Sequence, residues 1–320
     1  LLQIANVFTL LTTVPNLVWE INRGKYDIIY TRSQFFATIL LFLRWGKHKI
    51  FYEAHGLPSS KSFKFTTIKL LRKSDGIVGV TQTLLSQIFS QKVESANPLC
   101  KSLFAPSGFD PTVFHPTERK IAREKIKFSQ KNNLITFAGK LHTMGMDKGA
   151  GLIIDAAVDV LKKHPNTSFM FVGGPEESID ALMQKVTELK LPSKNFLFIQ
   201  KQKPADLAFF LAASDILVIT LTNQHHYKNY ASPMKLFEYM SVGVPIVTPY
   251  FKHLEEIIPL KLMPTIYQIE NRESLSEALN STLEDLSKKT QLATQLMVHA
   301  KDYDWASRAQ LICEHFQFTK

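Results

Sequence analysis

The stretch SPMKLFEYMSVGVPIV, Ser232 to Val247, predicts a short helix that runs directly into a strand. Ser232 suits the capping position, Pro233 suits the first helical position, and Gly243 fits the left-handed position that ends a helix. Pro245 then opens the strand PIVT. A helix of about three turns that is apolar over much of its circumference packs inside a protein.

A carboxylate, Glu238, lies within this otherwise apolar helix. A carboxylate in a packed helix needs a partner. One candidate is Lys235, which lies three residues earlier and within reach on a helix surface. The other is a hydroxyl-rich ligand held at the N-terminal end of the helix. The residues alone leave both alternatives open.

The composition limits the partners and the compartment. A chain of 320 residues, 45% of them hydrophobic, has enough material for two ordinary domains. Its net charge of +10 favours an anionic partner: a phosphorylated small molecule, nucleic acid or an anionic membrane. Cys100 and Cys313 lie far apart and outside any metal-ligand spacing. This pattern excludes a disulfide scaffold, argues against structural zinc and indicates a reducing compartment.

Short apolar runs alternate with longer helical patterns, which predicts two doubly wound α/β domains. We expect an N-terminal domain at 1–116, a C-terminal domain at 117–300, and a helix at 301–320 whose apolar residues are available to pack back on the N-terminal domain. The boundary near Pro116 lies in the charged stretch 110–133. The expected strands are YDIIYT, HKIFYEA, DGIVGV and SLFAPS in the first domain, and NLITFAG, SFMFVGG, NFLFIQ, DILVIT and PIVTP in the second.

Ligands of open parallel sheets bind beyond the C-terminal ends of the strands. The unusual residues of this chain fall on that edge: His55, Gly108, Gly139 with Lys140, Gly173 with Gly174, and Ser232. The segment FAGKLHTMGMDKGAG also places Lys148 at the start of a helix. Two lysines and the free amides of a helix N-terminus suit a diphosphate, although solvated loop lysines would give the same pattern.

Several familiar patterns are missing from the sequence. It contains no P-loop and no Gly-x-Gly-x-x-Gly fingerprint after a strand. It also contains no metal-ligand spacing, no Ser-His-Asp order and no paired-carboxylate signature. The basic residues lack the aromatic interleaving of RNA-binding modules, so nucleic acid is not an expected partner.

The most apolar segment, Phe35 to Trp45, is too short to span a membrane and is predicted to form a buried helix between two strands. Basic and apolar residues cluster nearby in FLRWGKHKIF and SSKSFKFTTIKLLRK. Such a cluster either makes peripheral contact with an anionic membrane or forms a solvated basic face. The sequence leaves both open.

Seven motifs, taken in order, resemble the GT-B glycosyltransferases of family 4, which are retaining enzymes with nucleotide-sugar donors. The motifs are YEAHGLP, DGIVGVTQTL, APSGFDPTVFHP, FAGKLHTMGMDKG, HPNTSFMFVGGP, SPMKLFEYMSVGVPIV and YDWASRA. The resemblance covers about residues 27–309. It implies two Rossmann-like domains facing a cleft, with the donor in the C-terminal domain and the acceptor in the N-terminal one. The implied reaction transfers a hexosyl group from a nucleotide-diphosphate sugar to a sugar, glycan or lipid-linked acceptor, with retention and without a metal or cofactor.

The resemblance also implies roles for single residues. Glu238 would bind the ribose hydroxyls of the donor. Lys140 and Lys148 would bind the pyrophosphate and neutralise the charge on the departing nucleoside diphosphate, so that no metal is needed. His55 would lie near the transferred sugar, which makes His55, Lys140 and Lys148 the expected catalytic residues. Further donor contacts would come from Gly139, Gly173 and Gly174, and from backbone groups at Ser232, Pro233, Met234 and Lys235.

Two features depart from the family pattern. Many members carry a glutamate eight positions before the one matched by Glu238, where this chain has Tyr230. Tyrosine donates a hydrogen bond but supplies no carboxylate, so we expect Tyr230 to contact the donor sugar. The first strand and glycine-rich loop of the family have no match here. We therefore expect an incomplete N-terminal domain, retained donor binding and weak or no transfer.

Two alternative functions remain open at this point. One is a nucleotide-sugar epimerase or hydrolase of the same fold. The other is a non-catalytic protein that binds nucleotide sugars or carbohydrates. For the glycosyltransferase we expect a place in polysaccharide biosynthesis, in the cytoplasm or peripheral on the inner face of the membrane.

Overall fold

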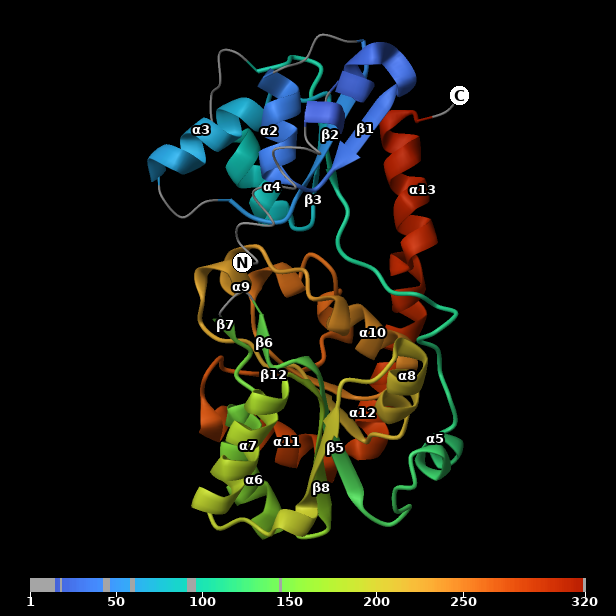
Figure 1. The fold of residues 1–320 in the computed structure, drawn as a ribbon. Helices are drawn as coiled ribbons and strands as arrows, with labels where there is room; N and C mark the ends of the chain where they lie inside the picture. The colour runs from blue at the N-terminus through green and yellow to red at the C-terminus, as the bar shows by residue number, and fades with distance from the viewer. Residues whose placement is uncertain are drawn as a thin grey trace. The chain divides into compact units, whose positions relative to one another are not determined.

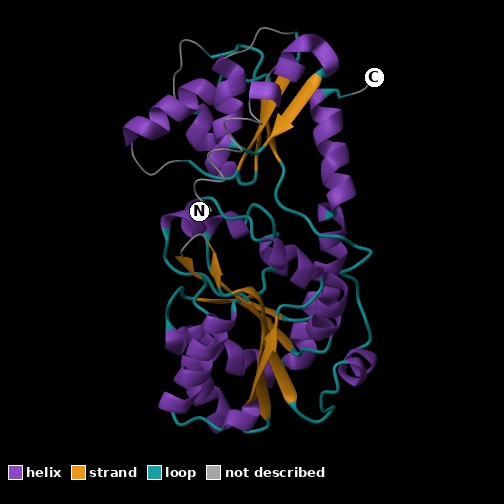
Figure 2. Cartoon of the chain, in the orientation of Figure 1, coloured by secondary structure: helices purple, strands orange, loops and turns teal. Residues whose placement is uncertain are grey.

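The computed structural model describes residues 15–17, 19–42, 47–57, 61–90, 96–143 and 146–318. The chain forms two compact units, and each alternates strands with helices (Figures 1 and 2). Unit 1 comprises Leu1–Pro106, Asn229–Ser232 and Arg308–Lys320, and unit 2 comprises Ser107–Lys228 and Pro233–Ser307. The chain therefore passes between the units more than once. Among the described residues, no helix has the length and apolar character needed to cross a bilayer.

Unit 1 is built on a parallel sheet of strand order β1-β2-β3-β4. The predicted buried helix is α2, which lies between β1 and β2 and buries Ala37 and Leu40, whereas residues 43–46 of the apolar segment lie outside the described residues. The elements are η1 (Ile21–Lys25), β1 (Ile28–Thr31), α2 (Gln34–Phe42), β2 (Lys49–Ala54), α3 (Lys61–Leu71), β3 (Gly76–Gly79), α4 (Gln82–Phe89) and β4 (Lys101–Phe104).

Helix α13 (Trp305–Phe316) supplies part of the core of unit 1 from Arg308 onward. Its Ile312 and Phe316 are buried in one cluster with Phe51 of β2. The ring centroids of Phe51 and Phe316 lie 4.8 Å apart. The aromatic and aliphatic surface of this helix thus covers one face of the unit 1 sheet.

Unit 2 contains a parallel sheet of strand order β12-β11-β10-β5-β8-β9. The chain adds β8 and β9 on one side of β5 and then returns to add β10, β11 and β12 on the other side. This reversal makes the C-terminal ends of β5 and β10 a topological switch point, where doubly wound folds bind ligands. The strands are β5 (Asn133–Lys140), β8 (Thr167–Gly174), β9 (Phe196–Gln200), β10 (Ile216–Val218), β11 (Ile246–Pro249) and β12 (Thr265–Tyr267).

Helices cover the unit 2 sheet (Figure 1). The buried core between them includes Phe137, Ile154 and Phe171. The helices are α5 (Arg119–Lys125), α6 (Gly151–Lys163), α7 (Glu176–Glu188), α8 (Pro204–Ala212), α9 (His225–Asn229), α10 (Met234–Val242), α11 (Arg272–Glu284) and α12 (Leu286–Ala300). Short turns occur at η2 (Ser193–Asn195), η3 (Lys252–Leu254), η4 (Leu260–Leu262) and η5 (Lys301–Tyr303), and a small antiparallel pair is formed by β6 (His142–Thr143) and β7 (Met146–Asp147).

All nine predicted strands are present, most of them shorter than predicted. The sequence did not predict β12, β6 or β7. These strands have two or three residues each, too few for a periodic pattern to emerge.

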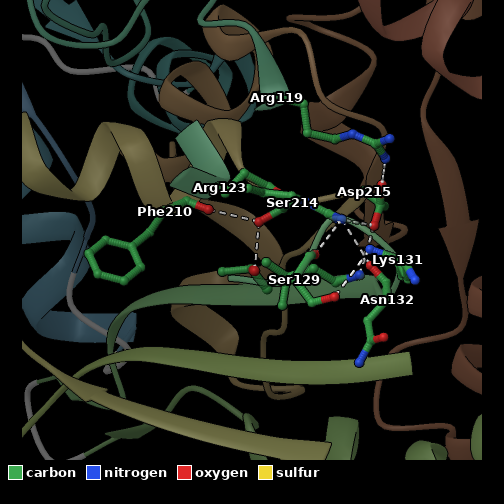
Figure 3. Close-up of polar contacts among 11 residues, drawn as sticks. Arg119, Arg123, Ser129, Lys131, Asn132, Phe210, Ser214 and Asp215 are labelled. Carbon is green, nitrogen blue, oxygen red and sulfur yellow. Dashed lines mark hydrogen bonds and ion pairs between the residues drawn. The ribbon is translucent and has the colours of Figure 1, made fainter. Parts of the chain in front are cut away.

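The charged stretch 110–133 is not the linker that its composition suggested. It contains α5, and Arg123 of that helix is fully buried. The Arg123 guanidinium pairs with Asp215 at 2.6 Å and donates hydrogen bonds to the carbonyls of Ala213, Ser129 and Asn132 (Figure 3). These bonds fix the stretch to unit 2. Consequently the units divide between Pro106 and Ser107 instead of at Pro116.

Candidate functional site

The helix predicted in the stretch Ser232–Val247 is α10, and Gly243 ends it in the left-handed conformation (φ 72°) expected for that residue. Its start differs from the prediction. Pro233 is the residue that flanks the helix, and its side chain gives no hydrogen bond to the first turn. Ser232 belongs to unit 1. The positive end of the α10 helix dipole lies at this turn, which suits an anion.

Lys235 extends from the first turn of α10 toward β5. Its Nζ lies 3.8 Å from the ring centroid of Phe137, a cation–π contact. The Nζ atom is buried and has no hydrogen-bond partner among the described residues. Burial and the charge of Lys148 lower the pKa of Lys235 to about 7, although Glu238 opposes this shift. The sequence analysis considered only the backbone of Lys235 as a ligand contact and missed its side chain.

Glu238 lies one turn further along α10. Burial raises the pKa of its carboxyl group, and the charge of Lys235 acts in the opposite direction. The two side chains interact electrostatically, but no ion pair or hydrogen bond joins them among the described residues. Lys235 therefore compensates the buried Glu238 carboxylate only in part. The carboxylate keeps its capacity to accept hydrogen bonds from a ligand.

Two glycines keep the C-terminal edge of the sheet open. A Cβ atom on Gly173 would lie 1.9 Å from the carbonyl oxygen of Gly139, so β5 and β8 approach each other too closely here for a side chain. A Cβ atom on Gly139, where φ is +131°, would lie 3.3 Å from Nζ of Lys235. Tyr239 joins α10 to the same edge, because its hydroxyl accepts the N–H of Ala138 at 2.8 Å.

The two lysines that were predicted to bind phosphate differ in their surroundings. Lys140, at the end of β5, is exposed. Lys148 is half-buried before α6, and its Nζ lies 4.1 Å from the ring centroid of Tyr227. Burial lowers the pKa of Lys148 to about 8. The turn that carries it is held by Asp147, whose carboxylate accepts the N–H of Gly149 at 3.0 Å.

The structure thus brings four predicted residues to one edge of the unit 2 sheet: Gly139, Lys148, Lys235 and Glu238. Contact between Gly139 and Lys235, together with the charge interactions of Lys235 with Lys148 and Glu238, shows their proximity. Gly173 pairs with Gly139 across the two strands and belongs to the same edge. Met234 begins α10 with its side chain half exposed. This edge carries a surplus of positive charge.

His55 lies in unit 1, directly after β2, at the sheet edge expected from the sequence. Its Nε2 lies 2.7 Å from Oε1 of Glu53. Glu53 also accepts a hydrogen bond from the Tyr30 hydroxyl and forms an ion pair with Arg308 at 3.0 Å. Sequence reasoning did not select Glu53, although a charged residue inside the apolar strand KIFYEA was a usable signal.

Glu53 is ionised despite its burial. Burial acts to raise its pKa, but the hydrogen bonds from His55 and Tyr30 and the charge of Arg308 outweigh that effect and lower it to about 2. An ionised carboxylate only accepts hydrogen bonds, so Nε2 of His55 must be the donor. The bond holds the imidazole in one orientation. Nδ1 is the ring nitrogen that does not take part in it.

Tyr230, expected to contact a donor sugar, lies in the core of unit 1. Its side chain is 2% exposed, and its hydroxyl donates a hydrogen bond to Gln87 at 2.9 Å. A sugar contact would require this side chain to leave the core. We therefore do not include Tyr230 among the residues that carry the function proposed below.

The described residues contain no group of three or more His, Cys, Asp or Glu side chains that could hold a metal ion. The positive charge at the unit 2 sheet edge comes from lysines instead.

Two α/β units with parallel sheets, the second sheet doubly wound and carrying lysines and glycines at its C-terminal edge, are the architecture of a GT-B glycosyltransferase. A family model described as "Glycosyl transferases group 1" matches residues 118–296, which is more than half of the 320 residues. The chain belongs to this family.

Two curated proteins show the extent of similarity along the chain. The chain is 23% identical to a D-inositol 3-phosphate glycosyltransferase of Rhodococcus opacus strain B4, over 92% of this chain and 68% of that protein. It is 24% identical to spore coat protein SA of Bacillus subtilis, over 65% of this chain and 55% of that protein.

Solved structures share the fold. HepE of Anabaena in complex with UDP has a TM-score of 0.77 at 18% identity, over 96% of this chain and 82% of that one. Sucrose-phosphate synthase of Thermosynechococcus elongatus has a TM-score of 0.74 at 16% identity, over 97% of this chain and 78% of that one.

Proposed function

We propose that this chain is a retaining hexosyltransferase that uses a nucleoside-diphosphate sugar and needs no metal ion. The observation that carries the proposal is the set of charged groups at the unit 2 sheet edge. Lys148 and Lys235 hold partly desolvated positive charge there, beside a Glu238 carboxylate that has no hydrogen bond within the described structure. The two lysines suit an anion, and the carboxylate suits a hydroxyl-bearing group. A nucleoside diphosphate carries both.

The nucleoside end of the donor is assigned to Glu238. Its carboxylate, fixed on a packed helix, accepts two hydrogen bonds from the adjacent hydroxyls of a ribose. Such a pair of bonds compensates the carboxylate for the water that burial removes.

The diphosphate end is assigned to Lys140 and Lys148, together with the first turn of α10 at Met234 and Lys235. Gly139, Gly173 and Gly174 let the backbone approach the ligand closely. When the bond between the sugar and the phosphate breaks, negative charge grows on the departing nucleoside diphosphate. Lysines already in place stabilise that charge, which is the role that a metal ion has in other transferases.

The sugar end is assigned to His55. Its Nε2 is bonded to Glu53, and its Nδ1 positions the transferred hexose. The incoming hydroxyl of a sugar, glycan or lipid-linked acceptor attacks on the same face of the hexose that the phosphate leaves. The departing phosphate takes the proton, and the configuration of the sugar is retained. This route needs no carboxylate nucleophile.

Two further parts of the proposal concern the partners. HepE, which shares the fold, is described in complex with UDP and with UDP-glucose, and this supports UDP as the first nucleotide to test. In unit 1, α3 carries basic residues such as Lys69 beside an exposed Phe65, which supports peripheral contact with an anionic membrane that holds the acceptor. Arg44 and Trp45 of the same predicted cluster lie outside the described residues.

Calorimetric titration of UDP, ADP, GDP, CDP and dTDP into the chain tests the donor site. We expect one nucleotide to bind and Glu238→Ala and Lys140→Ala each to weaken it about tenfold or more, the scale of a lost charge-assisted hydrogen bond. Lys194→Ala is the matched control, because this exposed lysine lies in η2, before β9 and away from the C-terminal edge. Binding that is unaffected by Glu238→Ala and Lys140→Ala contradicts the assignment.

Product analysis separates the reaction classes once a donor is known. Any glycoside formed from donor and acceptor should keep the anomeric configuration of the donor. A free epimer or free sugar as the main product, with acceptor present, would instead indicate an epimerase or a hydrolase.

A further inference from the structure

The ammonium group of Lys235 is under-satisfied in a way that few lysines are. Nζ carries three donors, is buried, and has no hydrogen-bond acceptor among the described residues. A buried polar group without hydrogen bonds destabilises the folded protein. Such a group in a native structure therefore needs an explanation. The cation–π contact with Phe137 offsets only part of this cost.

Nζ of Lys235 lies against an aromatic ring and beside a glycine. Phe137 lies on one side at 3.8 Å, and the side-chain-free Gly139 lies next to it. The charged groups that act on Nζ are Lys148, from the turn before α6, and Glu238, from α10 itself. Two lysines face one carboxylate, so the cluster lacks negative charge. The first turn of α10 carries Lys235 and adds the positive end of a helix dipole.

We propose that the side chain of Lys235 is an anion-binding group of the donor site, and that a phosphate of the nucleoside diphosphate supplies its hydrogen bonds. The inference rests on the proposed function and deepens it, because it adds a third lysine side chain to Lys140 and Lys148. Phosphate oxygens accept hydrogen bonds from ammonium groups and from helix N-terminal amides alike. One phosphate can therefore accept hydrogen bonds from Nζ of Lys235 and lie at the positive end of the α10 helix dipole.

Proton uptake is a measurable consequence. With pKa values of about 7 for Lys235 and about 8 for Lys148, the empty site is partly deprotonated at pH 8. A bound diphosphate favours the charged form of both lysines and raises both pKa values. Two tyrosines also lie beside these groups: the Tyr239 hydroxyl is bonded to the backbone of Ala138, and the Tyr227 ring contacts Nζ of Lys148. Burial raises the pKa of both hydroxyls, so neither changes charge at pH 8. Binding should thus take up protons at pH 8 and weaken as the pH rises from 7 to 9.

The experiment compares UDP with uridine by calorimetry on the full chain, as wild type and as Lys235→Met. We expect Lys235→Met to weaken UDP binding at least tenfold and uridine binding less than twofold, because uridine carries no phosphate. Lys194→Met should change neither. In buffers of different ionisation enthalpy at pH 8, the variant should take up fewer protons on UDP binding than the wild type.

Each result has a distinct meaning. Equal UDP affinity and equal proton uptake in wild type and Lys235→Met would overturn this inference and leave the donor site intact. Failure of the wild type to bind any nucleoside diphosphate would overturn the proposed function as well. We expect the melting temperature of Lys235→Met without ligand to equal or exceed that of the wild type, because a desolvated charge is removed. Lys235→Gln, which keeps a polar side chain without the charge, should show the same loss of UDP binding.

Discussion

Nε2 of His55 donates a 2.7 Å hydrogen bond to Oε1 of Glu53, and this carboxylate also receives the hydroxyl of Tyr30 and the guanidinium of Arg308. Arg308 is itself anchored to the carbonyls of Pro106 and Ala105. The residue predicted to meet the sugar is therefore oriented by a buried charge that the family resemblance did not mark. Glu53 acts on His55 and also ties α13 to β2.

Glu53→Gln should make unit 1 less stable at neutral pH and less sensitive to acid. The pKa of Glu53 is about 2 in the folded protein and 4.5 in the reference state, so the folded state binds fewer protons between these values. Stability from this group is present above pH 4.5 and is lost as the pH falls toward 2, by roughly 3 kcal/mol in total. Urea unfolding across this range should show a flatter pH dependence for Glu53→Gln, whereas exposed Glu277→Gln should keep the wild-type slope. Parallel curves for Glu53→Gln and wild type would show that folding does not lower the pKa of Glu53.

Arg123 and Arg119 pair with the same carboxylate, Asp215, but they should differ sharply in their effect on stability. Arg123→Met leaves the buried Asp215 with only the half-exposed Arg119 as its ion-pair partner among the described residues and leaves three carbonyls without their donor, which costs about 3–5 kcal/mol. Arg119→Met removes a half-exposed partner and should cost about 0–1 kcal/mol. Denaturant unfolding of unit 2 measures both values. Equal costs would show that burial does not determine the strength of these pairs.

Gly173→Ala should disrupt the sheet edge of unit 2, because its Cβ would meet the carbonyl of Gly139 at 1.9 Å. The two central strands must separate, at a cost of about 1–3 kcal/mol or more, and nucleotide binding should be lost. Gly174→Ala is the matched control for stability, since the nearest atom to its Cβ would be 3.9 Å away. Thermal unfolding of both variants checks the effect on the sheet, and UDP titration of Gly173→Ala checks the loss of binding. Equal melting temperatures of the two variants would contradict the prediction.

Glu238→Gln should stabilise unit 2 while it weakens donor binding. Burial raises the pKa of Glu238 above 4.5, so the folded state binds more protons than the unfolded state, and stability falls as the pH rises through this interval. The glutamine variant avoids this loss, and we expect its Tm to rise by about 2–4 °C at pH 7.5, which corresponds to ~1 kcal/mol in a domain of this size. The rise should be smaller at pH 4.5. Glu277→Gln, on the surface of α11, should change Tm at neither pH, and an unchanged Tm for Glu238→Gln would show that its carboxylate is not desolvated.

The strands were predictable from the sequence because each is a short apolar run with a clear end. Gly243 was predictable as a helix end because few residues other than glycine adopt its left-handed conformation readily. Gly139 followed from the rule that parallel sheets bind ligands at their C-terminal edge. Lys148 was selected by its place at the start of a helix, and Glu238 by its place in an otherwise apolar helix.

What the sequence did not reveal depends on contacts between distant residues. Arg123 looks like one more charge in a polar stretch, and only Asp215, 92 positions away, makes it a buried anchor. The side chain of Lys235 is buried against Phe137 and Gly139 on β5. Tyr230, which was expected to contact a sugar, is buried and donates its hydroxyl hydrogen bond to Gln87. Local patterns contain no information on such pairs.

The attachment of α13 to unit 1 sets the order in which a ribosome can complete this protein. Phe51 is covered by Ile312 and Phe316, which follow all of unit 2 in the sequence. At about 5–20 residues per second, residues 107–307 take roughly 10–40 s to synthesise. During that interval the nascent first unit exposes the apolar sheet face around Phe51. We expect chaperones to bind this face until α13 has been synthesised.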